Sequence, residues 1–381
     1  MKTKCNFNEL VEFSGSVCRP FESKKEYVST GCVHENLIFA QEIEMVDFKT
    51  KPSRANLQVE TGDIIFAKMQ GTKKTLQIDD ELSNKIYSTG FCAVRPKNGI
   101  ITEKCLYYLL NSSLFLKEKD KNCSGATQKA INSAGFKNIK LNVPDFSFQK
   151  DIENQLDILA EAINSKQIEL QKLDGLIKAR FVEMFGDYKN GINGNTVKLG
   201  DICTTCSGGT PTTKRPEYYT GTIPWISSPF LGDDYIDGKN AKAYITNEAI
   251  ENSATHLIPS DTLLFAIRIS VGKTSIIRES MCTNQDVVAL LNVDKTKYDL
   301  LFLKHTIDAY QEHFDRLKKG ATIQGITTND LKQIDIPDAN IKLQRQFATF
   351  VKRVNKSKFA VQESLEKTQL LFDSLMQKYF G

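Results

Sequence analysis

The sequence predicts an α+β protein in which two α/β domains are separated by two long antiparallel coiled-coil helices, as a pseudo-twofold tandem duplication. Residues 147–186 match residues 342–381 without a gap, and each stretch carries apolar residues at heptad spacing. The segments that precede the two stretches also match each other. We therefore expect five parts: a first domain at 1–146, a central helix at 147–186, a linker at 187–196, a second domain at 197–340 and a C-terminal helix at 341–381.

Both stretches are predicted to be helices because each keeps one apolar stripe and contains no proline. Only Gly175 interrupts the interior of either. Forty residues at about 1.5 Å each would reach roughly 60 Å, and a helix with so narrow a stripe cannot bury it alone. The obvious partner is the other helix, and the two stripes together form a predicted seam. Its residues are Ile152, Leu156, Leu159, Ile163, Leu170, Leu173, Ile177, Met184, Phe347, Val351, Val354, Val361, Leu365, Phe372, Leu375 and Tyr379.

Chain connectivity predicts that the two helices run antiparallel. The second domain begins where the first helix ends and finishes where the second helix begins, so parallel helices would force it to bridge about 60 Å. A domain of about 140 residues has a radius of gyration of only about 14–15 Å. Charge favours the opposite arrangement, because the first helix begins acidic and the second begins basic. Exposed ion pairs contribute under about 1 kcal/mol each, so connectivity carries more weight.

The duplication extends upstream of the helices. Gly125-Ala126-Thr127 and Gly320-Ala321-Thr322 stand 195 positions apart, and residues 62–68 resemble residues 260–266. Each of the segments 62–68 and 260–266 looks like a turn that leads into a buried strand. A period this long indicates a duplicated domain and not a solenoid repeat. In the first domain we also expect a helix over residues 102–116.

Composition is that of an ordinary soluble protein. The 381 residues can form two or three domains, with 40% hydrophobic and 25% charged residues and a net charge of +4. No apolar run is long enough to cross a membrane, and the N-terminus has no signal-peptide core. Nine scattered cysteines indicate a reducing compartment, so we expect a cytoplasmic protein.

Several motif-like patterns do not match the chemistry that they suggest. Gly272-Lys273-Thr274 lacks the first glycine of a phosphate-binding loop, because Ile267 stands in its place. Cys203 and Cys206 have no second Cys/His pair at zinc-finger spacing, and the four histidines are ungrouped, so we expect no metal. Neither an amino-methyltransferase tetrapeptide nor a complete nuclease carboxylate set is present. We therefore expect a non-catalytic chain.

The second domain carries motifs in a distinctive order. They are Gly-Gly-Thr-Pro at 208–211, Ile-Pro-Trp-Ile at 223–226, Arg-x-Ser-x-Gly-Lys at 268–273, Thr-Asn-Gln at 283–285 and Gly-Ala-Thr-x-Gln-Gly-Ile at 320–326. This order, followed by a long helix, resembles the target-recognition domains of specificity subunits of type I restriction-modification systems. The first domain keeps Gly-Ala-Thr-Gln-Lys at 125–129 and the helix. It lacks the first two motifs, as expected if the two domains read different DNA.

The resemblance implies a DNA-recognition subunit without catalytic activity. Each domain would read one half of a bipartite site in double-stranded DNA, while the helices would space the domains and bind two methyltransferase subunits. Restriction or translocase subunits would be further partners. No cofactor is expected in this chain, because the methyltransferase would bind S-adenosylmethionine. Two alternatives stay open: a stand-alone DNA-binding or regulatory protein, and the recognition part of a fused restriction-methyltransferase.

The residues expected to contact DNA lie on polar, basic loops. Hydroxyl, amide and basic side chains suit phosphates and base edges, although such loops can also be merely solvated. Trp225, by contrast, is expected to pack in the core. The candidate DNA-binding residues are Lys68, Gln70, Lys73, Lys74, Gln128, Lys129, Thr210, Thr212, Lys214, Arg215, Arg268, Ser270, Lys273 and Gln324.

Overall fold

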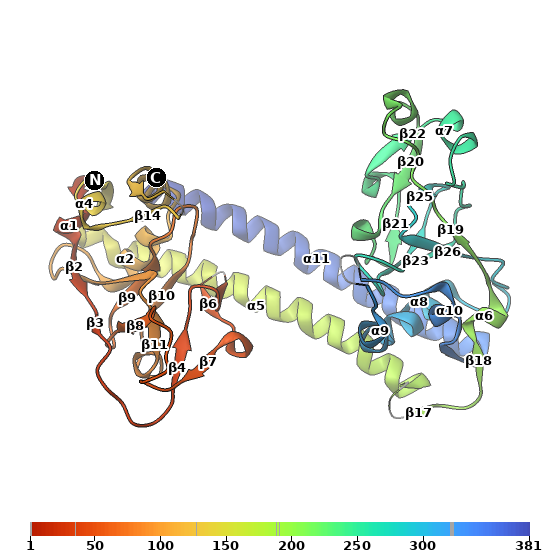
Figure 1. The fold of residues 1–381 in the computed structure, drawn as a ribbon, viewed down its shortest axis with the longest axis horizontal. Helices are drawn as coiled ribbons and strands as arrows, with labels where there is room; N and C mark the ends of the chain where they lie inside the picture. The colour runs from red at the N-terminus through yellow and green to blue at the C-terminus, as the bar shows by residue number, and fades with distance from the viewer. Residues whose placement is uncertain (1, 35, 127, 188, 190, 321–323) are drawn as a thin grey trace. The chain divides into compact units, whose positions relative to one another are not determined.

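The computed structural model of the protein describes residues 2–34, 36–126, 128–187, 189, 191–320 and 324–381 (Figure 1). The chain forms two units: the first contains residues 1–167 and 362–381, and the second contains residues 168–361. Thr127, Ala321 and Thr322 of the repeated Gly-Ala-Thr tracts lie outside the described residues.

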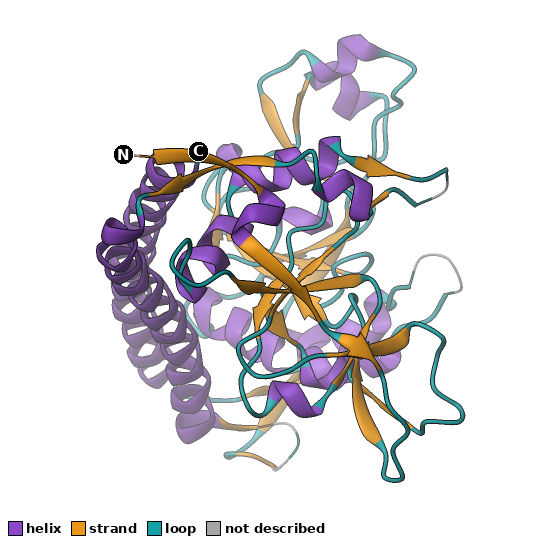
Figure 2. Cartoon of the chain, turned by 90° about the vertical axis from the view of Figure 1, so that its left-hand side faces the viewer, coloured by secondary structure: helices purple, strands orange, loops and turns teal. Residues whose placement is uncertain are grey.

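Two helices of 40 residues each, α5 (Phe146–Phe185) and α11 (Ile341–Phe380), contribute to both units. Helix α5 begins one residue before its predicted start, α11 begins at the predicted Ile341, and both end one residue before their closing glycines. Gly175 lies inside α5 without breaking it, because a single glycine costs only about 1 kcal/mol in a helix interior. In the views of Figures 1 and 2 the helices lie side by side.

Contacts in the second unit show that the helices are antiparallel, as predicted. Lys358 on α11 pairs with Asp174 on α5, and the ring of Phe347 lies 5.7 Å from that of Phe185. A later residue of α5 thus meets an earlier residue of α11. Phe185 and Phe181, which the predicted seam omits, are 1% and 6% exposed and belong to the main core of this unit.

The first unit uses the other half of each helix. Ile152 and Leu156 of α5 share a hydrophobic cluster with Met376 and Phe380 of α11, and all four are buried. Every residue of the predicted seam is buried or half-buried in its own unit. Met376 and Phe380 fall outside the predicted heptad, yet they close the core at the end of α11.

The first unit is built on two sheets. One has the order β10 (Thr75–Gln77), β9 (Ile64–Ala67), β12 (Phe91–Pro96), β2 (Val11–Ser14), and the other has the order β3 (Ser16–Val17), β8 (Ala55–Gln58), β11 (Ile86–Ser88), β4 (Lys25–Val28), β7 (Glu44–Val46). Three strand pairs are added: β1 (Lys2–Asn6) with β15 (Lys140–Pro144), β5 (Val33–His34) with β6 (Leu37–Ile38), and β13 (Cys123–Ser124) with β14 (Ala130–Ile131). Its short helices are α1 (Phe7–Leu10), α2 (Glu103–Leu110), α3 (Ser113–Lys121) and α4 (Ser133–Phe136).

The second unit has the same kind of architecture. Its largest sheet has the order β19 (Thr204–Ser207), β26 (Val287–Leu291), β23 (Leu263–Ala266), β24 (Thr274–Ile277), β21 (Tyr235–Ile236), and a smaller one has the order β22 (Ala243–Ile245), β20 (Ile223–Ile226), β25 (Cys282–Thr283). The added pairs are β18 (Thr196–Lys198) with β27 (Asp335–Pro337) and β16 (Gly186–Asp187) with β17 (Gly191–Ile192). Its short helices are α6 (Leu199–Ile202), α7 (Asn247–Glu251), α8 (Leu300–Ala309), α9 (Gln311–Leu317) and α10 (Thr328–Lys332).

The two units repeat one topology, which confirms the predicted tandem duplication. The strand order β10-β9-β12-β2 in the first corresponds to β24-β23-β26-β19 in the second. Both β9 (Ile-Ile-Phe-Ala) and β23 (Leu-Leu-Phe-Ala) are buried at all four positions. A strand that is buried on both faces needs such a continuous apolar run, which explains why this segment of the repeat was recognisable in the sequence.

A buried glutamine attaches α5 to the first unit. Gln149 is fully buried, and its Oε1 accepts a hydrogen bond from the Thr102 amide at 2.8 Å. Its Nε2 donates to the carbonyls of Ile100 and Pro144, both at 2.9 Å. One amide side chain thus satisfies three backbone groups at the junction of helix and domain.

The matching residue of α11 makes the same contacts in the second unit. Gln344 is fully buried and accepts from the Asp299 amide at 2.9 Å. Its Nε2 donates to the carbonyls of Lys297 and Ala339 at 3.0 and 2.7 Å. The match of Gln149 with Gln344 in the sequence therefore reflects an equivalent buried junction.

The helix predicted over residues 102–116 was wrong in its extent, because the structure has two helices there. Helix α2 ends at Leu110, and α3 begins at Ser113 and continues to Lys121. The Ser112 side chain accepts from the Phe115 amide at 3.1 Å and so caps the new helix. Serine is a favoured residue at the N-terminal cap of a helix, so Ser112 is a sequence signal that a second helix begins there.

Replacing Gln149 or Gln344 with leucine should lower the free energy of unfolding by about 2–4 kcal/mol, because three backbone groups would stay buried without partners. Urea denaturation of the full chain measures this change. The same substitution at the exposed Gln171 of α5 is the control and should stay within about 0.5 kcal/mol. A Gln149→Leu variant as stable as that control would contradict the role given to the buried amide.

A carboxylate also joins α5 to α2 in the first unit. Asp157 accepts from the Tyr108 hydroxyl at 2.6 Å and pairs with Lys104. Burial acts to raise the pKa of Asp157, but the hydrogen bonds from Lys104 and Tyr108 outweigh it and hold that pKa below its ordinary value.

Asp157→Asn should lower the free energy of unfolding at pH 7 by about 1 kcal/mol, and the difference from the wild type should shrink under acid. A carboxylate with a lowered pKa in the folded state contributes fully above the ordinary aspartate pKa of about 3.9. The contribution is lost as the pH falls through the lowered value. Urea unfolding at several pH values from 7 to 3 checks this, and a constant difference over the whole range would argue against it.

Candidate nucleic-acid interface

The loop that joins β9 to β10 carries several of the predicted DNA-binding residues of the first unit. Gln70 and Lys73 are exposed, while Lys68 and Lys74 are half-buried. Because β9 is buried throughout, the chain leaves the core at Lys68 and returns to it at Thr75. The loop thus presents polar groups on a rigid base.

A second polar tract packs against this loop. Met69 forms an antiparallel bridge with Ala130, and the Gln70 amide donates to the Lys129 carbonyl at 3.0 Å. The Gln128 amide nitrogen donates to the Met69 sulfur at 3.0 Å. The tertiary structure thereby brings Gln128 and Lys129, both exposed, next to Gln70, although about 60 residues separate them in the sequence.

The residue that holds the loop in place was not among the predicted ones. Lys119 on α3 is 1% exposed, and its ammonium group donates to the carbonyls of Met69 and Thr72 at 2.8 and 2.7 Å and to that of Ala67 at 3.3 Å. Burial lowers the pKa of Lys119, and the charge of Asp120 at 3.6 Å opposes this shift. A lysine in a polar helix resembles a surface residue, so no sequence signal pointed to this role.

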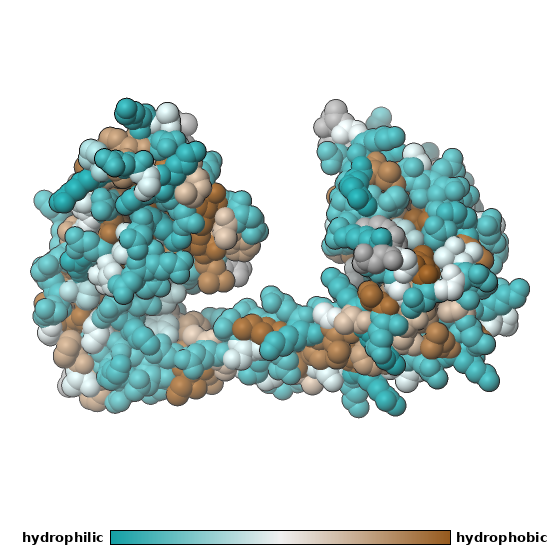
Figure 3. Space-filling model, turned by 90° about the horizontal axis from the view of Figure 1, so that it is seen from below, coloured by the Kyte–Doolittle hydropathy of each residue, from teal (hydrophilic) through white to brown (hydrophobic). Residues whose placement is uncertain are grey.

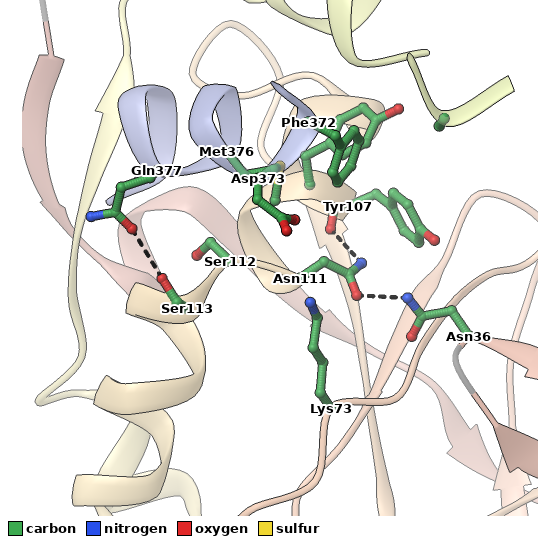
Figure 4. A pocket seen from close by; sticks show the side chains of 12 residues that line it. Asn36, Lys73, Tyr107, Asn111, Ser112, Ser113, Phe372, Asp373, Met376 and Gln377 are labelled. Carbon is green, nitrogen blue, oxygen red and sulfur yellow. Dashed lines mark hydrogen bonds between the residues drawn. The ribbon is translucent and has the colours of Figure 1, made fainter. Parts of the chain in front are cut away.

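Lys73 and Lys74, at the end of the loop, lie apart from Gln70, Gln128 and Lys129. Lys74 donates to the Thr30 carbonyl at 2.7 Å. Lys73 lines a pocket of about 370 Å³ and extends toward Asn111, which accepts a hydrogen bond from Asn36 at 2.8 Å (Figure 4). Lys73 therefore faces side chains of its own unit as well as solvent.

The corresponding loop of the second unit joins β23 to β24 and contains Arg268, Ser270 and Lys273. Arg268 and Lys273 are exposed and Ser270 is half-buried. Arg268 forms an antiparallel bridge with Gly325, which repeats the contact between Met69 and Ala130. Exposed Gln324 precedes that glycine, so it comes next to Arg268.

The adjacent residues Gln285 and Asp286 link this loop to the Gly-Gly-Thr-Pro segment. Arg268 lies 3.9 Å from the carboxylate of Asp286, and the Thr210 hydroxyl donates to Gln285 Oε1 at 2.5 Å. Gln285 was not among the predicted contacts, although the Thr-Asn-Gln motif that contains it had been noted. Trp225 is 5% exposed and donates to the Gly209 carbonyl at 3.0 Å, which confirms that it packs in the core.

Other predicted residues lie further along the Gly-Gly-Thr-Pro segment. Thr212 and Lys214 are exposed. Arg215 donates to the Tyr218 hydroxyl at 2.8 Å and lies 3.5 Å from Glu248. A guanidinium that already has these partners is less available to DNA than Arg268, whose carboxylate partner is more distant.

Apolar side chains outside the seam are exposed on both helices, and Figure 3 shows hydrophobic groups among polar ones along them. The exposed fractions range from 41% to 72%. In the first unit these residues are Phe146, Phe148, Ile158, Leu370 and Leu371, and in the second they are Ile168, Leu176, Val182 and Phe359. Single exposed apolar residues are common, whereas a contiguous group of them would mark a surface that a partner covers.

The described part of the chain contains no group of three or more His, Cys, Asp or Glu residues placed to hold a metal ion. None of the helices within the described ranges is long and apolar enough to span a membrane. All nine cysteines are unpaired thiols.

The sequence profile of the family described as "Type I restriction modification DNA specificity domain" matches this chain twice, at residues 17–173 and at residues 193–370. The two matches follow the internal duplication and together cover most of the chain.

Three curated relatives are specificity subunits of type I restriction enzymes. The MjaIX specificity subunit from Methanocaldococcus jannaschii is 27% identical over 177 residues, which cover 45% of this chain and 41% of that protein. The EcoR124I/EcoR124II specificity subunit from Escherichia coli is 27% identical over 176 residues, which cover 44% of this chain and 43% of that protein. The chain thus matches less than half the length of these two relatives. The HindI specificity subunit from Haemophilus influenzae is 20% identical over 386 residues, which cover 81% of this chain and 83% of that protein.

Two solved structures share the fold. A chain from a study of "complex assembly and conformational transition of the type I R-M system" has a TM-score of 0.61 at 17% identity, covering 99% of this chain and 97% of that one. The type I restriction-modification system S subunit from M. genitalium has a TM-score of 0.57 at 14% identity, with coverages of 100% and 96%. With the two profile matches on the two repeated units, this chain belongs to the family of type I restriction-modification DNA specificity domains.

Proposed function

We propose that this protein is the sequence-specific DNA-recognition subunit of a type I restriction-modification complex, and that each unit reads one half of a bipartite site. The observation that carries the proposal is a repeated arrangement with unlike side chains. In each unit a loop after a buried strand pairs with a second polar tract, through Met69 and Ala130 or through Arg268 and Gly325. A common scaffold with different loops suits two different half-sites.

The side chains on these loops suit recognition of bases and phosphates. Arginine pairs with guanine and glutamine with adenine in the major groove, while lysines contact phosphates. Gln70, Gln128 and Lys129 come together in the first unit, and Arg268, Gln285 and Gln324 do so in the second. We assign base contacts to the amides and to Arg268.

The helices would set the spacing of the half-sites and bind two methyltransferase subunits, with restriction or translocase subunits as further partners. The exposed apolar residues of α5 and α11 support a protein partner, because the seam leaves them uncovered. In this proposal the chain itself is non-catalytic, and S-adenosylmethionine is bound by the methyltransferase. A reducing compartment, expected to be the cytoplasm, suits nine unpaired cysteines.

Methylation mapping of the host genome with and without this gene tests the function. The methylated site that depends on the gene should consist of two different short sequences separated by unspecified bases. Co-purification with a methyltransferase is the companion measurement. A continuous palindromic site, or DNA binding without any effect on methylation, would refute the proposal and favour a stand-alone DNA-binding protein.

Removing the side chains that support the two loops should relax one half-site at a time. Lys119→Met removes the ammonium group that holds the first loop, and Gln311→Leu removes the side chain that donates to the Val271 carbonyl at 3.0 Å in the second. Each should lower affinity for its own half-site by roughly 1–3 kcal/mol, because the loop loses its fixed geometry.

Binding to duplexes with one half-site scrambled separates the two effects, and each variant is the control for the other. The Lys119→Met variant should still discriminate against changes in the half-site that Gln311→Leu relaxes. If both variants weaken recognition of the same half-site, the assignment of one loop to each half is incorrect.

A further inference from the structure

The loop between β23 and β24 carries an exposed isoleucine at its tip. Ile269 is 61% exposed, whereas Ile267 and Val271 on either side of it are 7% and 4% exposed. These two neighbours belong to the main core of the second unit and anchor the loop. Ile269 therefore contributes little to the core and presents its side chain to solvent.

The backbone at Ile269 is strained. Its φ is 64°, and the Ser270 amide donates to the Arg268 carbonyl at 2.7 Å, which closes a three-residue γ-turn of the rare positive-φ kind. The Gly272 amide then donates to the Ala266 carbonyl at 3.0 Å and fixes the base of the loop. A β-branched residue is unfavourable at positive φ, and strain of this kind gathers at functional sites.

Polar groups surround this apolar tip. Arg268 precedes it, Ser270 follows it, and Lys273 ends the loop. These three side chains can bind phosphates, guanine and other base edges through hydrogen bonds. None of them complements the one apolar feature of the major groove, the C5-methyl group of thymine, which proteins contact with apolar side chains.

We propose that Ile269 contacts the C5-methyl group of a thymine and so selects an A·T pair in the half-site read by the second unit. This inference rests on the proposed function and names a residue that determines its specificity. The strained turn fixes the side chain in its exposed position before DNA binds, which reduces the entropy lost on binding.

The first unit offers an internal comparison. Its loop has the same length, because Phe66 pairs with Thr75 across it as Phe265 pairs with Thr274 across the second loop. The residue that corresponds to Ile269 is then Gln70, whose amide suits adenine. The same loop position thus carries an apolar group in one unit and a hydrogen-bonding group in the other.

The test uses the full chain in complex with its methyltransferase and duplexes that contain the mapped site. Each thymine in turn is replaced by deoxyuridine, which lacks only the methyl group. For the wild type, one replacement should weaken binding roughly fourfold, the factor expected from one buried methyl group. Ile269→Ala should bind the unmodified site more weakly and lose this sensitivity, while sensitivity at the other thymines persists.

Two further variants separate recognition from folding. Ile269→Gly should raise the melting temperature by a few degrees, because glycine adopts positive φ without strain, and it too should be insensitive to deoxyuridine at that position. Gln70→Ala is the matched control at the corresponding loop position. It should keep the full penalty at the thymine that Ile269 contacts.

Specific outcomes would overturn the inference while leaving the proposed function intact. They are equal deoxyuridine penalties in the wild type and Ile269→Ala, a lower melting temperature for Ile269→Gly, or mapped half-sites without an A·T pair. A wild-type complex that shows no preference for any bipartite site would instead refute the proposed function itself, and the two failures are therefore distinguishable.

Discussion

The apolar contact between α5 and α11 is the interaction on which both units depend. In the first unit, Ile152 and Leu156 share their core with Met376 and Phe380, more than 200 positions away in the sequence. In the second, Phe181 and Phe185 pack with Phe347. Neither core is complete with one helix alone. The first unit therefore requires the C-terminal residues of the chain, and a contact of such long range is expected to form late in folding.

Each helix is also fixed to its domain by polar contacts, which apolar packing cannot replace. Gln149 and Gln344 satisfy equivalent sets of backbone groups, so the duplication extends to individual buried hydrogen bonds. Because a buried backbone group without a partner is costly, these positions tolerate little variation. They give each helix one defined attachment, that of α5 to the first unit and that of α11 to the second.

The β9–β10 and β23–β24 loops carry different side chains, although the strands that support them repeat between the two units. Gln70 and Ile269 occupy the same position on loops of equal length, yet one is an amide and the other is apolar. The loops are also supported differently: buried Lys119 holds the first, and Gln311 contacts the second. Surface loops can diverge in this way because few core contacts constrain them. The two loops have thus diverged on one duplicated fold.

The sequence alone determined the duplication, the two long helices and their antiparallel direction. Heptad spacing and the buried strands β9 and β23 are local patterns, and connectivity limits how the helices can run. Tertiary structure decided which candidate residues meet. Gln128 reaches Gln70, Gln324 reaches Arg268, and Lys119 is buried beneath its loop, through pairings across 50 to 60 residues. The bridges of Met69 with Ala130 and of Arg268 with Gly325 use the backbone, which any side chain permits, so the residue types do not reveal them. Lys119 is also hidden from sequence reasoning, because a lysine in a polar helix resembles a surface residue.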